Sequence, residues 1–317
     1  MKHILVTGGS GFIGSNLSLE LQSLYPQATL RVLDNFHGSS FKNLLGFNGD
    51  VLAYNVSDTS WMRILKSEPL DAIFHLASIT DTTVLDEQKM MFDNVEGFRN
   101  ILDLAVEKRC PVVYASSAAT YGSQLSMKIE DAGIPNNIYG FSKWTLENLA
   151  RTYQSKIKTV GLRYFNVFGP RETFKDKAAS MIYQLYLQMK AGKRPRIFKY
   201  GEQRRDFIYV KDVVSCTIKA LEAVQSTVVN VGTGKSTSFN QLIEALNEGL
   251  GTQYEADYFD NPYDFYQNFT EADMNPAKKD LGFECKYSTR EGILDYVRTY
   301  LIPASSESAK VPGTVGK

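Results

Sequence analysis

Glycine recurs near the start of the chain, in the segment Gly8-Gly9-Ser10-Gly11-Phe12-Ile13-Gly14. The segment follows a short apolar run and leads into a stretch with helical spacing. In such a place one glycine permits a sharp turn, one lets the backbone approach a pyrophosphate, and one allows close contact between helix and strand. The start of the helix adds free N–H groups and the positive end of its dipole. The pattern therefore predicts a dinucleotide site rather than a plain turn, with contacts from Gly8, Gly11, Phe12, Ile13 and Gly14.

An acidic residue, Asp34, follows Gly14 at the distance expected for a contact with the cofactor's ribose. A carboxylate at the end of the second predicted strand can accept hydrogen bonds from both ribose hydroxyls, which favours NAD. His37 or Lys42 would instead neutralise the 2′-phosphate of NADP, so both cofactors stay open. A turn or capping role for Asp34 and a solvated Lys42 are the structural alternatives. We include Asp34, Asn35 and Lys42 in the predicted cofactor site.

Tyr139 and Lys143 are four residues apart in a stretch with helical spacing, so their side chains are expected on one helix face. A phenol is a weak acid, and a nearby ammonium together with a positively charged nicotinamide would stabilise its phenolate. Ser116 and Ser117 end a predicted strand, where parallel sheets bind their ligands. This combination of serine, tyrosine and lysine predicts the removal of hydride from an alcohol beside a nicotinamide cofactor.

Four segments together resemble the extended short-chain dehydrogenase/reductase family, over nearly the whole chain except its last residues. They are the glycine segment, residues 116–122 (SSAATYG), the Tyr139 and Lys143 pair, and residues 163–171 (RYFNVFGPR). Within the family, residues 114–122, residues 163–172 with Lys175, and residues 201–209 are similar to the ADP-heptose 6-epimerases. The resemblance implies an ADP-heptose substrate of lipopolysaccharide core synthesis. It also implies bound NADP, with NAD as the alternative, that takes hydride from C6 of the heptose and returns it to the other face.

The same resemblance assigns roles to individual residues. It implies two acid–base groups, Tyr139 and Lys175, with Lys143 lowering the pKa of the tyrosine and holding the ribose. Lys177 competes with Lys175, for which a solvated loop lysine or a phosphate contact is the structural alternative. Further cofactor contacts are implied for Leu76, Ala77, Ser78, Asn94, Tyr139, Lys143 and Val167. Substrate contacts are implied for Asn166, Lys175, Lys177, Gln184, Phe198, Gly201, Arg205 and Tyr266.

Three other functions share parts of the pattern that suggests an ADP-heptose 6-epimerase. A UDP-hexose 4-epimerase would share the glycine segment and the Tyr139 and Lys143 pair, but would not require Lys175. A nucleotide-sugar 4,6-dehydratase carries an Asp-Glu pair after its serine-type residue, whereas Ala118 and Ala119 follow Ser117 here. A redox-sensing binding protein without activity would be marked by loss of the tyrosine or lysine, and both are present.

The elements that position these residues alternate between strand and helix in the first half, which predicts a doubly wound parallel α/β sheet of Rossmann type. Strands are expected at residues 2–7, 29–34, 51–54, 72–77, 112–116, 159–165 and 228–231. Helices are expected at residues 13–24, 61–66, 92–108, 139–154, 178–191, 212–224, 240–250 and 289–301. We assign residues 1–168 to the dinucleotide domain, with a returning segment near 206–233. Residues 169–302 form a smaller mixed α/β lobe for the nucleotide sugar, and 303–317 a disordered tail.

Composition narrows the class of protein. The chain has 317 residues, 43% of them hydrophobic, and its 35 basic and 35 acidic residues cancel, which argues against a nucleic-acid partner. The three cysteines form no CxxC, no metal site is predicted, and His75 is expected as a buried core residue. The P-loop-like residues 232–236 (GTGKS) lack the first glycine, so they are expected to form a plain loop. A cytoplasmic protein without membrane contact is expected, and by resemblance a homo-oligomer, often a pentamer.

Overall fold

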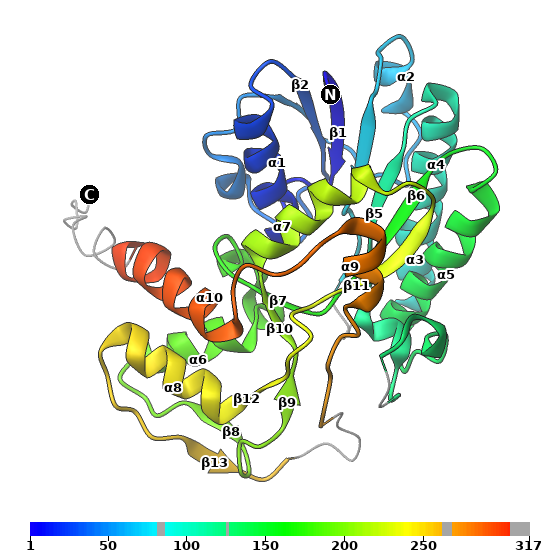
Figure 1. The fold of residues 1–317 in the computed structure, drawn as a ribbon. Helices are drawn as coiled ribbons and strands as arrows, with labels where there is room; N and C mark the ends of the chain where they lie inside the picture. Colours follow the sequence, from blue (N-terminus) through cyan, green and yellow to red (C-terminus); the bar gives the residue numbers. More distant parts are fainter. Residues whose placement is uncertain (81–85, 125–126, 262–267, 305–317) are drawn as a thin grey trace, which may run out of the picture.

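Seven parallel strands form the central sheet of the computed structural model, which describes residues 1–80, 86–124, 127–261 and 268–304. Their order is β11-β6-β5-β4-β1-β2-β3, and Figure 1 shows the sheet with its surrounding helices. From β1 the chain first adds β2 and β3 on one side and then β4, β5 and β6 on the other, and this switch leaves a crevice at the carboxyl ends of β1 and β4. The strands are β1 (His3–Thr7), β2 (Thr29–Leu33), β3 (Asp50–Leu52), β4 (Ala72–His75), β5 (Val112–Ser117), β6 (Thr159–Tyr164) and β11 (Thr227–Val231).

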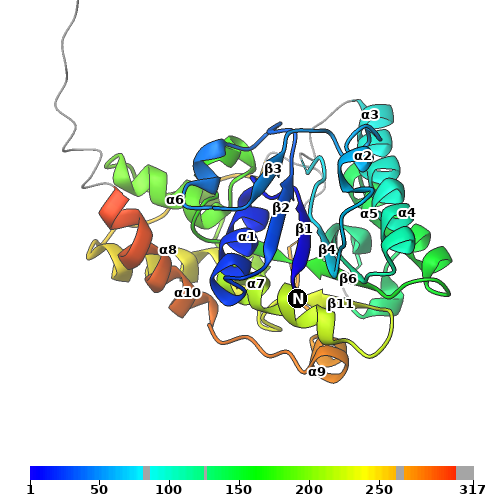
Figure 2. The ribbon, with the colours of Figure 1, turned by 90° about the horizontal axis from the view of Figure 1, so that it is seen from above.

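Helices cover both faces of this sheet (Figure 2). On one face lie α1 (Phe12–Leu24) and α7 (Val210–Lys219), which pack against each other. On the other lie α4 (Gly97–Lys108) and α5 (Ile138–Tyr153). Each face has its own core of buried apolar side chains, because strands buried on both sides alternate their side chains between the two layers. The predicted Rossmann-type fold is therefore confirmed, and the strand expected at residues 228–231 joins the sheet beside β6.

Two helix boundaries differ from the prediction. The helix expected to start at Phe92 begins earlier, because the Asp86 side chain accepts a hydrogen bond from the Lys89 N–H and caps α3 (Glu87–Met91). A π-helical turn, η2 (Phe92–Glu96), then leads into α4. The helix expected over 212–224 is α7, followed by a single 3₁₀ turn, η6 (Ala220–Glu222).

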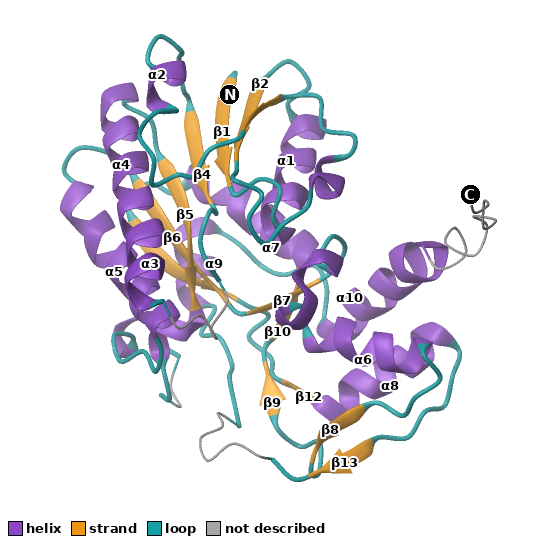
Figure 3. Cartoon of the chain, turned by 180° about the vertical axis from the view of Figure 1, so that it is seen from behind, coloured by secondary structure: helices purple, strands orange, loops and turns teal. Residues whose placement is uncertain are grey.

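The second lobe holds short strand pairs that the sequence did not predict (Figure 3). β7 (Asn166–Phe168) pairs in parallel with β10 (Phe207–Tyr209), β8 (Arg196–Phe198) pairs in parallel with β13 (Asp257–Phe259), and β9 (Arg204–Arg205) pairs antiparallel with β12 (Thr237–Ser238). The lobe's helices are α6 (Met181–Lys190), α8 (Phe239–Leu250) and α10 (Thr289–Tyr296). Ser238 and Ser288 begin α8 and α10 with complete capping boxes.

The described residues also form shorter elements: η1 (Phe41–Leu44), α2 (Met62–Leu65), η3 (Ala118–Tyr121), η4 (Ile129–Asp131), η5 (Thr173–Ala178), α9 (Asn275–Leu281) and a π-helical turn η7 (Val297–Leu301). Residues 302–304 continue helically after η7, so the tail predicted from Pro303 starts no earlier than residue 305, which lies outside the described residues. In the described ranges, none of the helices has both the length and the apolar character needed to cross a bilayer.

Candidate active site

A cavity of about 770 Å³ opens at the carboxyl ends of β1, β2, β4 and β5. It is the crevice expected for a dinucleotide in a sheet of this order. Most of the residues predicted for the cofactor and for catalysis line it. They are Gly8, Gly11, Phe12, Ile13, Gly14, Asp34, Asn35, Leu76, Ala77, Ser78, Asn94, Ser116, Ser117, Tyr139, Lys143, Val167 and Lys175. Among the predicted cofactor contacts only Lys42 does not line it; this side chain is exposed on η1.

The glycine loop is shaped for a phosphate group. Gly8 has a positive φ of 68°, and a Cβ there would lie 2.6 Å from the Ala77 nitrogen. A Cβ on Gly14 would lie 2.0 Å from the Gly8 oxygen, so any side chain would push α1 off the sheet. Gly11 is the N-cap residue directly before α1, and no side chain caps this end of the helix. Free N–H groups at a buried helix start fit a pyrophosphate, so the residues present fit a dinucleotide cofactor.

Asp34 is buried against the glycine loop at the end of β2. Its carboxylate accepts hydrogen bonds from the Ser10 N–H at 2.9 Å and the Phe36 N–H at 2.7 Å. The turn role considered for this residue is therefore present, and the side chain lines the cavity as well. His37 also lines the cavity, so the two groups that would favour different cofactors both lie at its edge.

Tyr139 and Lys143 lie on one face of α5, as predicted. The helix starts with Asn137, whose side chain accepts a hydrogen bond from the Gly140 N–H at 2.8 Å. The Lys143 ammonium is buried, donates to the Ala115 carbonyl at 2.9 Å, and lies 5.8 Å from the centre of the Tyr139 ring. The Tyr139 hydroxyl is hydrogen bonded to Ser117.

The pKa of the tyrosine differs from the prediction. Burial raises the pKa of Tyr139, and the hydrogen bond with Ser117 opposes this rise only in part. Burial also lowers the pKa of Lys143 to about 7, so its ammonium loses much of its charge near neutral pH. The protein alone therefore does not provide the expected lowering of the Tyr139 pKa, because burial dominates the shift and also reduces the charge on Lys143.

The two serines at the end of β5 make different contacts. Ser117 bonds Tyr139, whereas the Ser116 hydroxyl donates to Glu147 Oε1 at 2.5 Å. Glu147 forms an ion pair with Arg163 at 2.7 Å, and both side chains are fully buried. Ser117 is thus the serine whose hydroxyl meets the predicted proton donor, while Ser116 joins a buried network beneath it.

Asn94 lies in the π-helical turn η2, lines the cavity, and is hydrogen bonded to Ile79, which also lines it. Its side-chain oxygen accepts from the Ile79 N–H at 2.7 Å, and its amide donates to the Ile79 carbonyl at 3.1 Å and to the Ser142 hydroxyl at 3.0 Å. These bonds join the segment after β4 to α5. A π turn widens a helix locally, which brings this amide to the cavity, and such turns are common at functional sites.

Lys175 lines the cavity from a different element than Tyr139. It lies in a 3₁₀ segment, η5 (Thr173–Ala178), and its nitrogen is 5.6 Å from the centre of the Phe12 ring. Burial lowers the pKa of Lys175, and the negative charge of Glu172 works against this shift. The side chain of the competing Lys177 and all of Tyr266 lie outside the described residues, so both assignments stay predictions.

The other residues predicted to contact substrate do not line this cavity. The Asn166 amide donates to the Asp206 carbonyl, and the Gln184 amide donates to the Ala179 carbonyl. Phe198 packs edge-on against Phe259 in the β8–β13 pair. Gly201 and Arg205 lie between β8 and the end of β9. Their substrate contacts therefore stay predictions.

Several lining residues were not predicted. Tyr54, Asn55 and Val56 follow β3, and Phe174 directly precedes Lys175. The position of the first three at the carboxyl end of a parallel strand was the available signal. His75 is buried in β4 as expected, with Nδ1 bonded to the Thr7 hydroxyl at 2.8 Å, and burial lowers its pKa to about 3.

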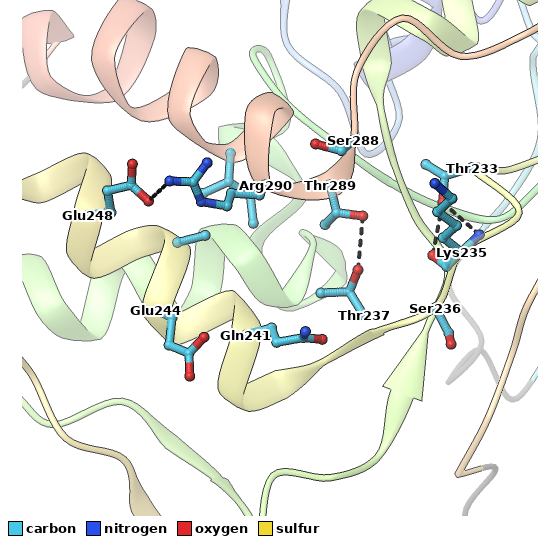
Figure 4. Close-up of a pocket in the computed structure, with 12 residues that line it drawn as sticks. Thr233, Lys235, Ser236, Thr237, Gln241, Glu244, Glu248, Ser288, Thr289 and Arg290 are labelled. Carbon is cyan, nitrogen blue, oxygen red and sulfur yellow. Dashed lines mark hydrogen bonds and ion pairs between the residues drawn. The ribbon is translucent and has the colours of Figure 1, made fainter.

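A second hollow of about 440 Å³ lies between α8 and α10 (Figure 4). The P-loop-like residues 232–236 form the expected loop after β11 at its edge, held by the buried carboxylate of Asp206. Arg290 and Glu248, which also line the hollow, are paired with each other. Among the residues that the structure describes, no group of three or more His, Cys, Asp or Glu could hold a metal ion.

Comparison with known proteins adds three similar structures. Residues 4–232 match the NAD dependent epimerase/dehydratase family. The ADP-L-glycero-D-manno-heptose-6-epimerase of Helicobacter pylori is 39% identical, with a TM-score of 0.89 over 94% of this chain and 96% of that one. The UDP-glucose 4-epimerase of Thermotoga maritima is 29% identical, with a TM-score of 0.86 over 95% and 99%. A UDP-glucuronic acid 4-epimerase mutant of Bacillus cereus, solved with NAD, is 26% identical, with a TM-score of 0.82 over 94% and 99%.

Proposed function

The chain belongs to the NAD dependent epimerase/dehydratase family, and on that premise we propose that it inverts C6 of the heptose in ADP-D-glycero-D-manno-heptose. The product would be ADP-L-glycero-D-manno-heptose, a precursor of the lipopolysaccharide core. The observation that carries this proposal is a cavity with Tyr139 and Lys175 both in its wall. The likeness to the Helicobacter pylori enzyme supports it, at 39% identity over 94% of the chain.

Inversion requires that hydride leaves one face of the carbon and returns to the other. NADP, when bound, would accept the hydride and give it back. The protein must remove the proton from the C6 hydroxyl during oxidation and supply one during reduction, on opposite sides of the sugar. Tyr139 and Lys175 come from separate elements, α5 and η5, so they offer two such groups.

The pKa shifts of the two groups suit this division. Burial raises the pKa of Tyr139, so the phenol keeps its proton and can donate it to a ketone oxygen. Burial lowers the pKa of Lys175, so more of the amine is neutral and can accept a proton. We assign Ser117 to hold the Tyr139 hydroxyl and Lys143 to bind the ribose.

A UDP-hexose 4-epimerase is the second candidate. The observation that favours it is Asp34, whose carboxylate lines the cavity where it would bind the ribose of NAD and repel the 2′-phosphate of NADP. The UDP-glucose 4-epimerase of Thermotoga maritima is the similar structure that supports it. In this function Lys175 would have no acid–base role.

One experiment separates the two functions. The cofactor released from freshly purified protein is identified by mass spectrometry, and the protein is then incubated with ADP-D-glycero-D-manno-heptose while NMR follows the sugar. Inversion at C6 with NADP recovered supports the proposal. An unchanged heptose with NAD recovered contradicts it, and UDP-galactose becomes the next substrate.

The role assignment is tested by two substitutions. Tyr139→Phe and Lys175→Met should each lower turnover by roughly 10²- to 10⁴-fold, the usual contribution of a positioned acid or base. Both should leave the cofactor bound, because neither side chain belongs to the glycine loop. A fully active Lys175→Met variant would show that Lys177 or water serves as the second group.

A further inference from the structure

A buried asparagine, Asn43, connects the glycine loop to the segment that carries Lys175. The residue is 2% exposed and lies on η1. Its amide donates to the Ser10 carbonyl at 3.0 Å and to the Arg171 carbonyl at 3.3 Å. Its own backbone carbonyl accepts from Arg171 Nε at 3.3 Å. One side chain therefore joins the glycine loop to the segment that precedes Lys175.

A second asparagine reinforces this connection. The Asn16 amide on α1 donates to the Pro170 carbonyl and to the Phe12 carbonyl, each at 2.9 Å, and its oxygen accepts from an Arg171 guanidinium nitrogen at 3.3 Å. Arg171 has a positive φ of 72°, a conformation that a side chain rarely adopts without support. The bonds from α1 and η1 supply that support, so the backbone at residue 171 is fixed relative to the glycine loop.

Lys175 follows directly from this fixed point. Its N–H donates to the Glu172 carbonyl at 3.0 Å, which makes one turn from residue 172 to residue 175. The Glu172 carboxylate is fully buried and accepts from the Gly169 N–H and the Ser180 N–H, closing both ends of the segment. The Lys175 nitrogen then lies over Phe12, the first residue of α1. The amine thus lies beside the glycine loop, to which its backbone segment is joined through the Asn43 amide.

We propose that Asn43 is a positioning residue for Lys175, holding the amine in the cavity wall beside the glycine loop. The inference rests on the proposed function, because it assumes that Lys175 acts on the sugar. Asn43 faces backbone carbonyls rather than the cavity, which it does not line. Its effect would therefore pass through the backbone of residues 171–175 and not through contact with cofactor or substrate.

A double-mutant cycle tests this proposal with the whole protein. Asn43→Ala should lower kcat by about 10- to 100-fold, because small displacements of a reacting group cost that much. In the Lys175→Met background the same substitution should change kcat by less than about twofold, since its target is already gone. Equal losses in both backgrounds would overturn the inference, because Asn43 would then act through the cofactor loop or through stability alone. Full activity of Lys175→Met would remove the premise that Lys175 acts on the sugar and so would overturn this inference, whereas the proposed function itself fails only if the heptose is not inverted at C6.

A second measurement needs no substrate. Hydrogen exchange of peptides covering residues 169–175 should speed up by about tenfold or more in Asn43→Ala, while peptides from α5 stay unchanged. Unchanged exchange in 169–175 would also overturn the inference. Asn43→Leu has a similar volume without the N–H donors and adds no buried charge, so it serves if the alanine variant does not fold. Asn247→Ala is the matched control, because its amide also bridges backbone groups, at Tyr254 in the second lobe.

Discussion

The two walls of the cavity that carry Tyr139 and Lys175 are built in different ways. Tyr139 lies on α5, a helix packed on the central sheet, and Glu147 on the same helix face forms a fully buried ion pair with Arg163 of β6. Lys175 lies in a 3₁₀ segment held by asparagine amides and a buried carboxylate. We call α5 with Tyr139 the tyrosine wall and residues 169–180 with Lys175 the lysine wall. The tyrosine wall is part of the core of the fold, whereas the lysine wall is a loop that is hydrogen bonded to that core.

This difference indicates how each side chain is held in place. Tyr139, Lys143 and Glu147 follow each other at four-residue intervals, so the ion pair fixes the rotation of α5 and with it the direction of the tyrosine. Among the residues that the structure describes, no ion pair joins the lysine wall to the sheet, and the asparagine amides that hold this wall donate to backbone carbonyls. We expect substitutions in the tyrosine wall to lower the free energy of unfolding of the whole protein. We expect substitutions in the lysine wall mainly to displace Lys175 locally.

The largest effect is expected from Glu147→Ala. It leaves the Arg163 guanidinium buried without its carboxylate, which should lower the free energy of unfolding by about 3–5 kcal/mol. The double variant Glu147→Leu/Arg163→Met should regain much of this loss, because it removes both buried charges. Urea unfolding measures all three proteins. A single variant as stable as the parent would show that the ion pair does not hold this wall.

A smaller effect is expected from Glu172→Gln in the lysine wall. The carboxylate accepts from the Gly169 N–H, the Ser180 N–H and the Ser180 hydroxyl, and an amide keeps only one acceptor oxygen. We expect a loss of about 1–3 kcal/mol in the free energy of unfolding. The loss in turnover should exceed the loss expected from unfolding alone, because Lys175 moves. If activity per folded molecule is unchanged, the two walls do not differ in the way described.

The smallest effect is a pH dependence from the tyrosine wall. Burial lowers the pKa of Lys143 from 10.5 to about 7, so between these values the unfolded chain binds more protons than the folded one. The free energy of unfolding should therefore rise with pH in this window, by about 1 kcal/mol between pH 7 and pH 8. Lys143→Met should remove this rise. Urea unfolding at both pH values checks it, and an equal rise in the variant would assign it to another group.

The sequence predicts one wall better than the other for a physical reason. The glycine segment, the strands and the Tyr139 and Lys143 pair are local patterns, and the parallel sheet brings their carboxyl ends together. The hydrogen bonds between Asn43 and Arg171 join residues that are 128 positions apart. The residues around each of them in the sequence form no pattern that predicts this contact. The same holds for the raised pKa of Tyr139, which depends on burial by elements from several parts of the chain.

The position of β11 restricts how such a protein can change over evolutionary time. The chain leaves the sheet after β6, builds part of the second lobe, returns as β11, and then leaves again for α8 and α10. The second lobe is therefore encoded in two separate stretches. Recombination that exchanges this lobe between relatives needs several crossover points at once, and a fragment cut after residue 168 would lose an edge strand of the sheet. The lobe is thus more easily altered by point substitution than by its replacement.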